Sequence, residues 1–73
     1  MERVKKETYC QNGVSVKTVL VLQFPMPAIY RCYQVDADGI FGNRSFDDEL
    51  SALTEHDRRV KTNGGPVNEK EFA

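Results

Sequence analysis

Apolar side chains, with Thr18 among them, occupy every second position over residues 14–24, VSVKTVLVLQF, and this spacing is that of a β-strand with one buried face. In the middle of this segment Val19 and Val21 fill the opposite face as well, so we expect the centre of the strand to be buried on both faces. Residues 7–11 and 28–35 are rich in aromatic and β-branched side chains, which favour strands. The pattern therefore predicts three strands in the first half of the chain.

Two short connections join these strands. Asn12-Gly13 lies between the first two, and Asn-Gly is a strong signal for a hairpin with a type I′ turn. Pro25 and Pro27 interrupt the chain before the third strand, because a proline has no N–H to donate to the ladder. Short connections favour antiparallel neighbours, so we predict a three-stranded antiparallel sheet.

The spacing changes to that of a helix after Val35. Four apolar side chains share one helical stripe within residues 46–61, and we expect them to pack on the sheet: Phe46, Leu50, Leu53 and Val60. Ser45, followed three residues later by Asp48, is a capping-box-like start. The segment 63–66, Asn-Gly-Gly-Pro, is typical of a helix end.

Together these elements predict a small α+β protein. We expect a single domain over residues 1–63, a three-stranded antiparallel sheet followed by one amphipathic helix, and then a frayed, flexible tail over residues 64–73. A core built from 73 residues is small. We therefore expect Leu50→Ala and Leu20→Ala each to lower the free energy of unfolding by about 2–5 kcal/mol.

The composition, with 40% hydrophobic and 29% charged residues, is that of a folded, soluble domain. The longest apolar run, residues 19–22, is too short to span a bilayer, and the basic N-terminus lacks the apolar segment of a secretory signal. We therefore expect a cytoplasmic protein without a membrane partner. Cys10 and Cys32 lack the number of a disulfide scaffold and the spacing of a zinc site, so we expect two reduced, half-buried thiols.

Charge is unevenly spread along the chain, although the net charge is only −1. Residues 36–57 carry seven acidic side chains against one basic side chain, Arg44, whereas residues 1–35 carry five basic and two acidic ones. A nucleic-acid-binding protein usually presents a basic face and a basic balance. A basic surface on another protein suits the acidic segment better, and the alternative is a helix face that is merely solvated.

Residues 36–45, DADGIFGNRS, combine carboxylates and glycines ahead of the predicted helix and could suggest a calcium loop. An EF-hand loop that starts at Asp36 would place Ile40 at a ligand position and Phe41 at the position that requires glycine. The segment therefore fails the pattern of a calcium-binding loop at a ligand and at the turn.

The same segment is accounted for by turn and cap chemistry. In this interpretation Asp38-Gly39 and Gly42-Asn43 make turns, Ile40 and Phe41 enter the core, and Ser45 caps the helix. We favour this interpretation because it gives each residue a local role without any ligand.

Residues 38–45, DGIFGNRS, also resemble the signature of peptidoglycan-binding domains, in which Asp-Gly-Ile-Phe-Gly, a proline, any residue and a threonine open the last helix. Residues 38–42 match letter for letter, while Asn43 replaces the proline and Ser45 the threonine. The resemblance implies a cell-wall-binding module with a helix just upstream. Here the upstream segment is interrupted by prolines and has a strand-like pattern.

We find no pattern of catalytic, metal-binding or cofactor-binding residues, and we expect neither an enzyme nor a cofactor. His56 is the only histidine, and a lone helical histidine is more often a surface or dipole-satisfying residue than a catalyst. Ser45 is better used as a cap than as a nucleophile, because no base has a route to it. No glycine-rich phosphate loop follows a strand.

In its size, its single domain and its uneven charge, the chain resembles the short early proteins with which lytic phages bind and redirect host RNA polymerase. The resemblance implies a small, non-enzymatic phage-type regulator or inhibitor that alters transcription. We hypothesise that the chain binds a basic surface on a host protein, with bacterial RNA polymerase as the first candidate. The expected partner-binding residues are Asp47, Asp48, Glu55, Arg59, Arg3, Lys5 and Lys6.

Within this set we expect Asp47, Asp48 and Glu55 to face solvent, with Arg59 beside Glu55 one turn further along the helix. Two other functions stay open. One is a peptidoglycan-binding module, and the other is a regulator that binds DNA directly through Arg3 and Lys5-Lys6. Direct DNA binding ranks lower, because this basic cluster is small and the predicted helix is not a basic, groove-reading one.

Overall fold

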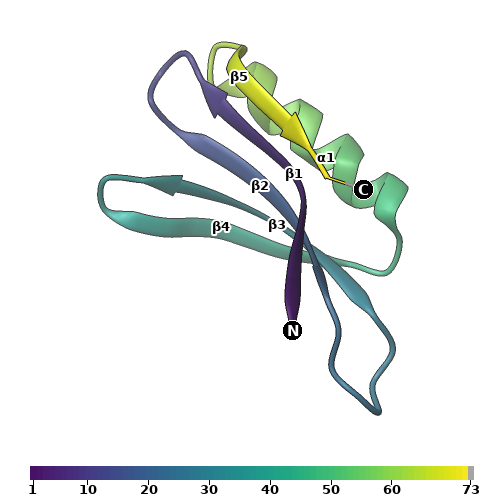
Figure 1. The fold of residues 1–73 in the computed structure, drawn as a ribbon. Coiled ribbons are helices and arrows are strands. Elements are labelled where there is room, and N and C mark those ends of the chain that lie inside the picture. The colour runs from purple at the N-terminus through teal and green to yellow at the C-terminus, as the bar shows by residue number, and fades with distance from the viewer. Residues whose placement is uncertain (73) are drawn as a thin grey trace.

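The computed structural model describes residues 1–72, which form one sheet and one helix (Figure 1). Along the chain the elements are β1 (Glu2–Cys10), β2 (Ser15–Val21), β3 (Ile29–Asp36), β4 (Gly39–Phe46), α1 (Glu49–Thr62) and β5 (Pro66–Glu71). The predicted α+β class is confirmed. The predicted three-stranded sheet is wrong, because the described residues form a sheet of five antiparallel strands.

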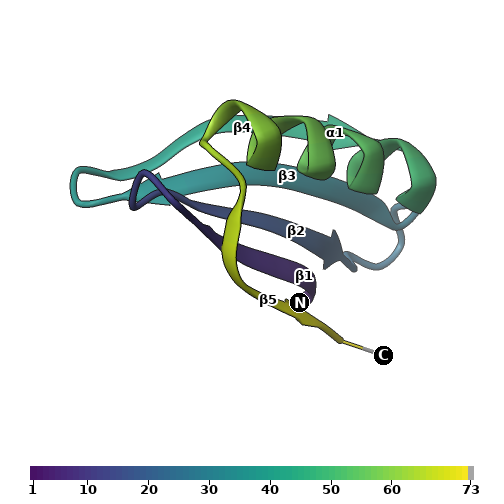
Figure 2. The same ribbon diagram turned by 90° about the horizontal axis from the view of Figure 1, so that it is seen from above.

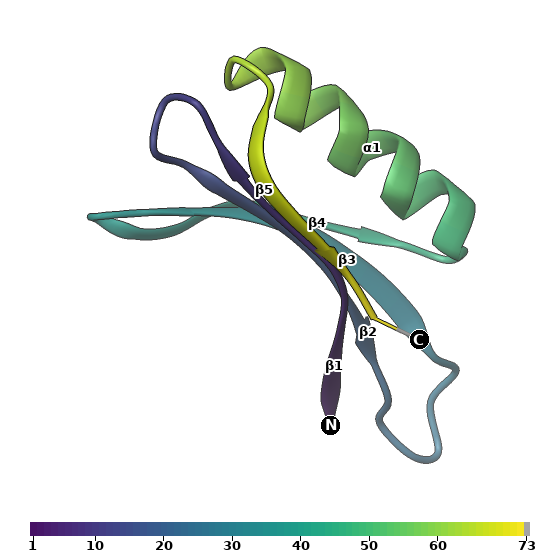
Figure 3. The same cartoon turned by 45° about the horizontal axis from the view of Figure 1, so that its top comes forward.

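The strand order in the sheet is β4-β3-β2-β1-β5. β1 to β4 form a meander, and α1 then carries the chain back across the sheet so that β5 pairs with β1 (Figure 1). Within residues 1–72, α1 covers one face of the sheet and no helix covers the opposite face (Figures 2 and 3). The molecule therefore has one two-layer side and one open sheet face.

The central strand β2 is buried on both faces, as its sequence pattern predicted. Val16 and Thr18 face α1, and Val19 and Val21 lie on the opposite face; all four are buried. The apolar cluster beneath the helix is small and consists of Cys10, Val16, Cys32 and Val60, with Phe46 packed against it. Much of the remaining buried side-chain surface beneath the helix is polar.

The two cysteines are unpaired, as predicted, but they are fully rather than half buried. Burial raises the pKa of the Cys10 thiol, and burial also raises the pKa of the Cys32 thiol despite the nearby Arg59 cation. Both thiols therefore behave as small core side chains.

β5 takes the place of the predicted frayed tail, so that prediction is wrong. It pairs with β1 in the register Lys6 to Glu71, Glu7 to Lys70 and Thr8 to Glu69, and opposite charges face each other in two of these pairs. All six residues of β5 are exposed, so the strand depends on backbone pairing and leaves no apolar pattern in the sequence. Ala73, the last residue of the predicted tail, lies outside the described residues.

A turn is present near the predicted Asp38-Gly39, but one residue earlier: Ala37 and Asp38 form it, and Asp36 and Gly39 are the closing pair of the β3–β4 hairpin. The second predicted turn, at Gly42-Asn43, is instead a β-bulge within β4. The pairing register shifts there between Cys32 and Gln34, and Gly42 has a φ of +67°, which favours glycine.

Ile40 and Phe41 were expected in the core, and this expectation is wrong. Their exposed fractions are 66% and 41%. Both residues lie in the first half of β4, next to the β3–β4 turn, where this edge strand projects beyond α1 (Figures 1 and 3).

The helix begins later than predicted. Ser45 stays in β4, and Asp48 is the N-cap residue: the Ser51 N–H donates to Asp48 Oδ2 (2.9 Å) and the Ser51 hydroxyl donates to Oδ1 (2.8 Å). These bonds, first the one from the Ser51 backbone, lower the pKa of the Asp48 carboxyl.

The predicted stripe is correct only in part: Val60 is buried, Phe46 packs against the apolar cluster from β4 and Leu53 is half-buried. The buried side chains of α1 are Ala52, Glu55, His56, Arg59 and Val60. Leu50 is 76% exposed, so the prediction that it packs on the sheet is wrong. The polar members of the stripe find partners in the sheet, and these bonds decide which side of the helix faces inward.

The hairpin predicted at Asn12-Gly13 is confirmed, but its turn is not type I′. Gly13 has a φ of +88°, and within residues 1–72 no residue other than glycine has a positive φ. The Gly13 N–H donates to the Cys10 carbonyl (3.0 Å), which closes the turn.

Candidate functional site

The structure separates the predicted partner-binding residues into three groups. Asp47, Asp48 and Arg3 are exposed, as a binding surface requires. Lys5 and Lys6 are half-buried. Glu55 and Arg59 are each only 8% exposed, so the expectation that Glu55 faces solvent is wrong.

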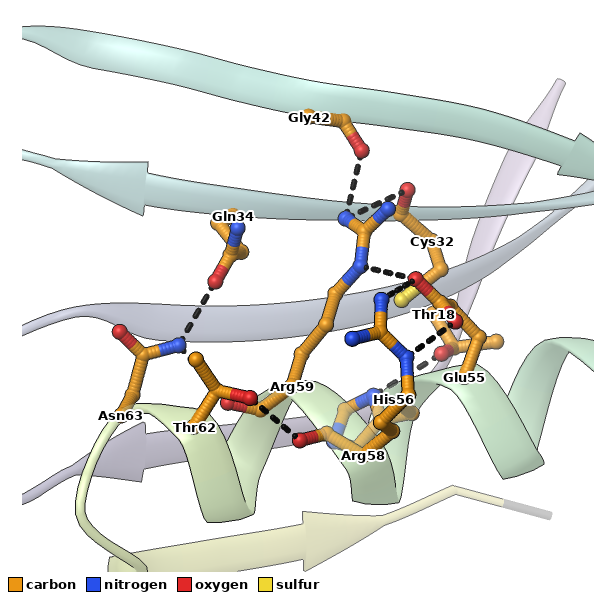
Figure 4. A network of polar contacts seen from close by, with 10 residues as sticks. All are labelled: Thr18, Cys32, Gln34, Gly42, Glu55, His56, Arg58, Arg59, Thr62 and Asn63. Carbon is orange, nitrogen blue, oxygen red and sulfur yellow. Dashed lines mark hydrogen bonds and ion pairs between the residues drawn. The ribbon is translucent and has the colours of Figure 1, made fainter.

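Glu55 and Arg59 belong to a buried ionic network at the centre of α1 (Figure 4). The predicted contact between them is confirmed, with Arg59 Nε 2.7 Å from Glu55 Oε2. Arg58 binds the same carboxylate in a bidentate manner, with Nε 2.9 Å from Oε1 and Nη2 2.6 Å from Oε2. These hydrogen bonds, those from Arg58 first, lower the pKa of Glu55 to about 2.

Arg59 also joins the helix to the sheet. Its Nη1 donates to the carbonyls of Cys32 in β3 and Gly42 in β4 (Figure 4). The bulge at Gly42 thus presents a carbonyl to the guanidinium, and the side chain is committed to the fold rather than to a partner.

His56 of α1 is fully buried beneath the helix, where its ring contacts β1 and β2. Its Nε2 lies 2.9 Å from Thr8 Oγ1 and its Nδ1 lies 2.9 Å from Thr18 Oγ1. The Thr8 hydroxyl donates to Glu69 Oε1 (3.0 Å), so it accepts from Nε2–H, and the Thr18 hydroxyl donates to Nδ1. Burial, reinforced by the Lys6 cation, lowers the pKa of His56 to about 4.

Lys6 is neutralised by carboxylates from two elements. Its Nζ lies 3.1 Å from Asp57 in α1, 3.6 Å from Glu69 and 3.7 Å from Glu71, both in β5. Partial burial opposes its charge, but the Asp57 hydrogen bond and the three carboxylates outweigh this effect and raise the pKa of Lys6. Lys6 is therefore a poor candidate for contacting a phosphate backbone.

The start of α1 carries the exposed acidic surface. Asp47, Asp48 and Glu49 are consecutive and exposed, and Leu50, which follows them, is 76% exposed. None of the ion pairs within residues 1–72 neutralises these three carboxylates. We define residues 47–50 as the acidic surface.

A second surface, which the sequence analysis treated only as a strand interruption, lies on the loop between β2 and β3. Phe24 is fully exposed and Met26 is 65% exposed. The signal was present in the sequence, because residues 22–28, LQFPMPA, contain four apolar or aromatic side chains and two prolines without a single charge.

The open face of the sheet holds a small polar depression lined by Glu7, Tyr9, Asn68 and Lys70. Glu7 stands opposite Lys70 in the strand register, and Lys17 Nζ lies 3.8 Å from the Glu7 carboxylate. The charges in this depression therefore compensate one another.

Residues 36–45 form the β3–β4 turn and most of β4, and one acidic side chain of this segment makes a local hydrogen bond. The Asp36 carboxylate accepts from the Asp38 N–H (2.8 Å), which stabilises the turn. Within residues 1–72 no group of three or more His, Cys, Asp or Glu side chains could hold a metal ion. Residues 38–45 form a hairpin turn and an edge strand, whereas the resemblance to peptidoglycan-binding domains implied the opening of a helix.

Within the part of the chain that the structure describes, no helix has the length and apolar character needed to cross a bilayer. In comparisons with protein-family models, curated proteins and solved structures, no family model, no curated protein and no solved structure matches this chain.

Proposed function

We propose that this chain is a non-enzymatic interaction protein that binds a basic surface of a partner protein through the acidic surface at the start of α1. One observation carries the proposal: Asp47, Asp48 and Glu49 are adjacent, exposed and free of the ion pairs that occupy Glu55 and Asp57. Uncompensated charge of one sign attracts a surface of the opposite sign and accelerates association.

Leu50 adds an apolar contact beside these carboxylates. An exposed leucine beside three carboxylates contributes little to folding. When a partner covers it, its apolar surface is removed from water, which favours binding. The resemblance to short phage regulators makes bacterial RNA polymerase the first partner to test, with an altered rate of transcription as the outcome of binding.

The charge-reversal variant must leave the helix intact. Asp48 caps α1, so it is retained, and Asp47→Lys is combined with Glu49→Lys. Glu49→Lys is also measured alone and should slow association in the same direction; Asp38→Lys is its matched control, because Asp38 is also exposed and the same charge is introduced away from α1.

Association of labelled protein with purified bacterial RNA polymerase is measured at two salt concentrations. We expect the double variant to associate at least about tenfold more slowly at low salt and the difference to shrink at high salt, because salt screens the steering field. Asp38→Lys should associate like the unchanged protein.

Insoluble peptidoglycan and duplex DNA serve as alternative ligands in the same assay. The absence of binding to polymerase, or binding that ignores both the charge reversal and the salt, would reject the proposal. Retention on peptidoglycan would instead support a cell-wall-binding module.

A further inference from the structure

The loop of residues 22–28 is uncharged and exposes two large apolar side chains, Phe24 and Met26. Phe24 is 101% exposed and Met26 is 65% exposed, and Met1, which is joined to the base of the loop, is 74% exposed. Elsewhere, Ile40 at 66% and Phe41 at 41% are adjacent in β4, where successive side chains point to opposite faces of the sheet, and Val67 at 56% stands alone in β5. Single exposed side chains are ordinary, whereas a group on one loop is typical of an interaction site.

The loop is held in shape although it is exposed. The Met1 ammonium donates to the Leu22 carbonyl (2.9 Å) and the Leu22 N–H donates to the Met1 carbonyl (2.8 Å), which fixes the base of the loop. The Met26 N–H donates to the Gln23 carbonyl (2.7 Å), and Pro25 and Pro27 restrict the backbone on both sides of Met26. A loop restrained in this way loses little entropy when a partner covers it.

The loop lies at the same end of the sheet as the acidic surface. Val21, before the loop, pairs with Ile29, after it, and the next residue, Tyr30, pairs with Phe46, which directly precedes the acidic surface. Figures 1 and 3 show the β2–β3 loop and the start of α1 at the same end of the molecule. One partner can therefore contact both.

The charges around the loop decide which kind of partner fits. At the base of the loop the Met1 ammonium and Glu2 offset each other, so the uncompensated charge nearby is that of the three carboxylates of the acidic surface on the other side. Arg3 and Arg31 sit further back along the strands, opposite Leu20 and Val19. An anionic lipid surface would approach these carboxylates unfavourably, whereas a protein pocket with a basic rim complements them.

We propose that Phe24 and Met26 are the apolar anchor of the interface and insert into an apolar pocket with a basic rim on the partner protein. This inference rests on the proposed function, and it divides the work between two neighbouring surfaces. The acidic surface accelerates association, and the loop slows dissociation by burying an exposed aromatic side chain.

The first test uses the variant Phe24→Ala/Met26→Ala and the control Ile40→Ala/Val67→Ala, which truncates two other exposed apolar side chains away from the loop. Binding to purified bacterial RNA polymerase is followed at two salt concentrations. We expect the loop variant to dissociate at least about tenfold faster with an unchanged salt dependence of association, and the control to dissociate like the unchanged protein. Urea unfolding midpoints of all variants should coincide, because none of these side chains is buried.

The second test reports burial directly. Cys10 and Cys32 are buried, so a cysteine introduced by Met26→Cys can be labelled selectively with an environment-sensitive fluorophore. We expect its emission to shift to the blue when polymerase binds. The same label introduced by Ile40→Cys should not shift.

The outcomes separate this inference from the proposed function. Binding that depends on the acidic surface but ignores Phe24 and Met26 would overturn the inference and leave the proposed function standing. No binding to polymerase by the unchanged protein would overturn both. Two further results would also overturn the inference: Phe24-dependent binding to vesicles of phosphatidylglycerol and phosphatidylcholine, and a Phe24-dependent dimer of this chain in sedimentation.

Discussion

His56 is neutral in the folded protein because it is enclosed between two threonine hydroxyls and faces charged groups from three elements: Lys6 in β1, Asp57 and Arg59 in α1, and Glu69 in β5. The unfolded chain takes up the proton near pH 6.5, whereas the folded protein takes it up only near pH 4. The unfolded state therefore binds more protons between these values, and stability falls as the pH drops through them.

We expect the free energy of unfolding to decrease by about 3 kcal/mol between pH 7 and pH 4 from this residue. Urea unfolding at several pH values measures the loss, and NMR titration of the only imidazole gives the folded pKa directly. His56→Gln should flatten the dependence between pH 6.5 and pH 4. An imidazole that titrates near pH 6.5 in the folded protein would contradict the prediction.

Truncation of an exposed side chain should change the free energy of unfolding much less than truncation of a buried one. Leu50 is 76% exposed, so Leu50→Ala should change the free energy of unfolding by less than about 0.5 kcal/mol. Val16 is completely buried in the apolar cluster, so Val16→Ala should cost about 2 kcal/mol. Denaturant titration of both variants checks which side of α1 faces the sheet. A large loss of stability for Leu50→Ala would show that Leu50 packs on the sheet after all.

At the residue scale the sequence predicted the contact between Glu55 and Arg59, because their spacing alone brings them together on a helix. It could not predict that the pair is buried. A reading based on hydrophobicity assigns polar residues to solvent, whereas here His56 and Arg59 find hydroxyl and carbonyl partners in strands that are distant in the sequence. Those partners, and not apolar area, set the side of the helix that faces inward.

Among the elements, β5 depends on a few identifiable bonds. Glu69 is the acceptor for the buried Thr8 hydroxyl, whereas Glu71 only shares the Lys6 ammonium at 3.7 Å. Glu69→Ala should therefore cost about 1–2 kcal/mol, because it leaves a buried donor without its partner. Glu71→Ala should cost less than about 0.5 kcal/mol, as is usual for a surface ion pair.

Glu69→Gln retains an acceptor oxygen and should recover most of the stability lost in Glu69→Ala. Denaturant titration provides the free energies, and amide hydrogen exchange along β1 reports whether β5 stays paired. Equal losses for Glu69→Ala and Glu71→Ala would show that the Thr8 bond does not anchor the strand.

The same dependence on pairing explains which elements were predictable. β2 and β3 carry buried side chains, and their patterns predicted them. β4 and β5 are the edge strands of the sheet, and almost every residue in them is exposed. An edge strand forms because a neighbour offers N–H and C=O groups, so residues 39–46, with two glycines, read as a loop.

At the scale of the whole molecule, the helix layer is joined to the sheet layer by polar side chains as much as by apolar contact. Arg59 donates hydrogen bonds from α1 to both β3 and β4. Arg59→Met should cost about 3 kcal/mol, because it leaves the buried Glu55 carboxylate with Arg58 as its remaining cation and removes two hydrogen bonds to backbone carbonyls of the sheet.

The double variant Glu55→Leu/Arg59→Met removes both buried charges, and we expect it to be at least about 1 kcal/mol more stable than Arg59→Met alone. Denaturant titration of the two single variants and the double variant forms the cycle. Additive losses would mean that the two side chains are independent.

The candidate interface is assembled by the strand order of the whole sheet. Phe24 and the acidic surface lie more than twenty positions apart in the sequence, and only the pairing of β3 with β4 brings them to one end of the sheet. The sequence supplied the acidic segment and the proline-bounded loop as separate observations. Their proximity required the strand order.

The threonines around His56 have one further consequence. Apolar side chains are interchangeable neighbours, so an apolar core tolerates a strand that slides by two residues along its partner. Here a slide of β2 by two residues would offer the imidazole Val16 or Leu20 in place of Thr18, and the ring would lose the hydroxyl that it needs. The hydrogen bonds of His56 therefore favour a single pairing register of β1 with β2. In a chain with so small an apolar core, they help to specify one alignment of the strands.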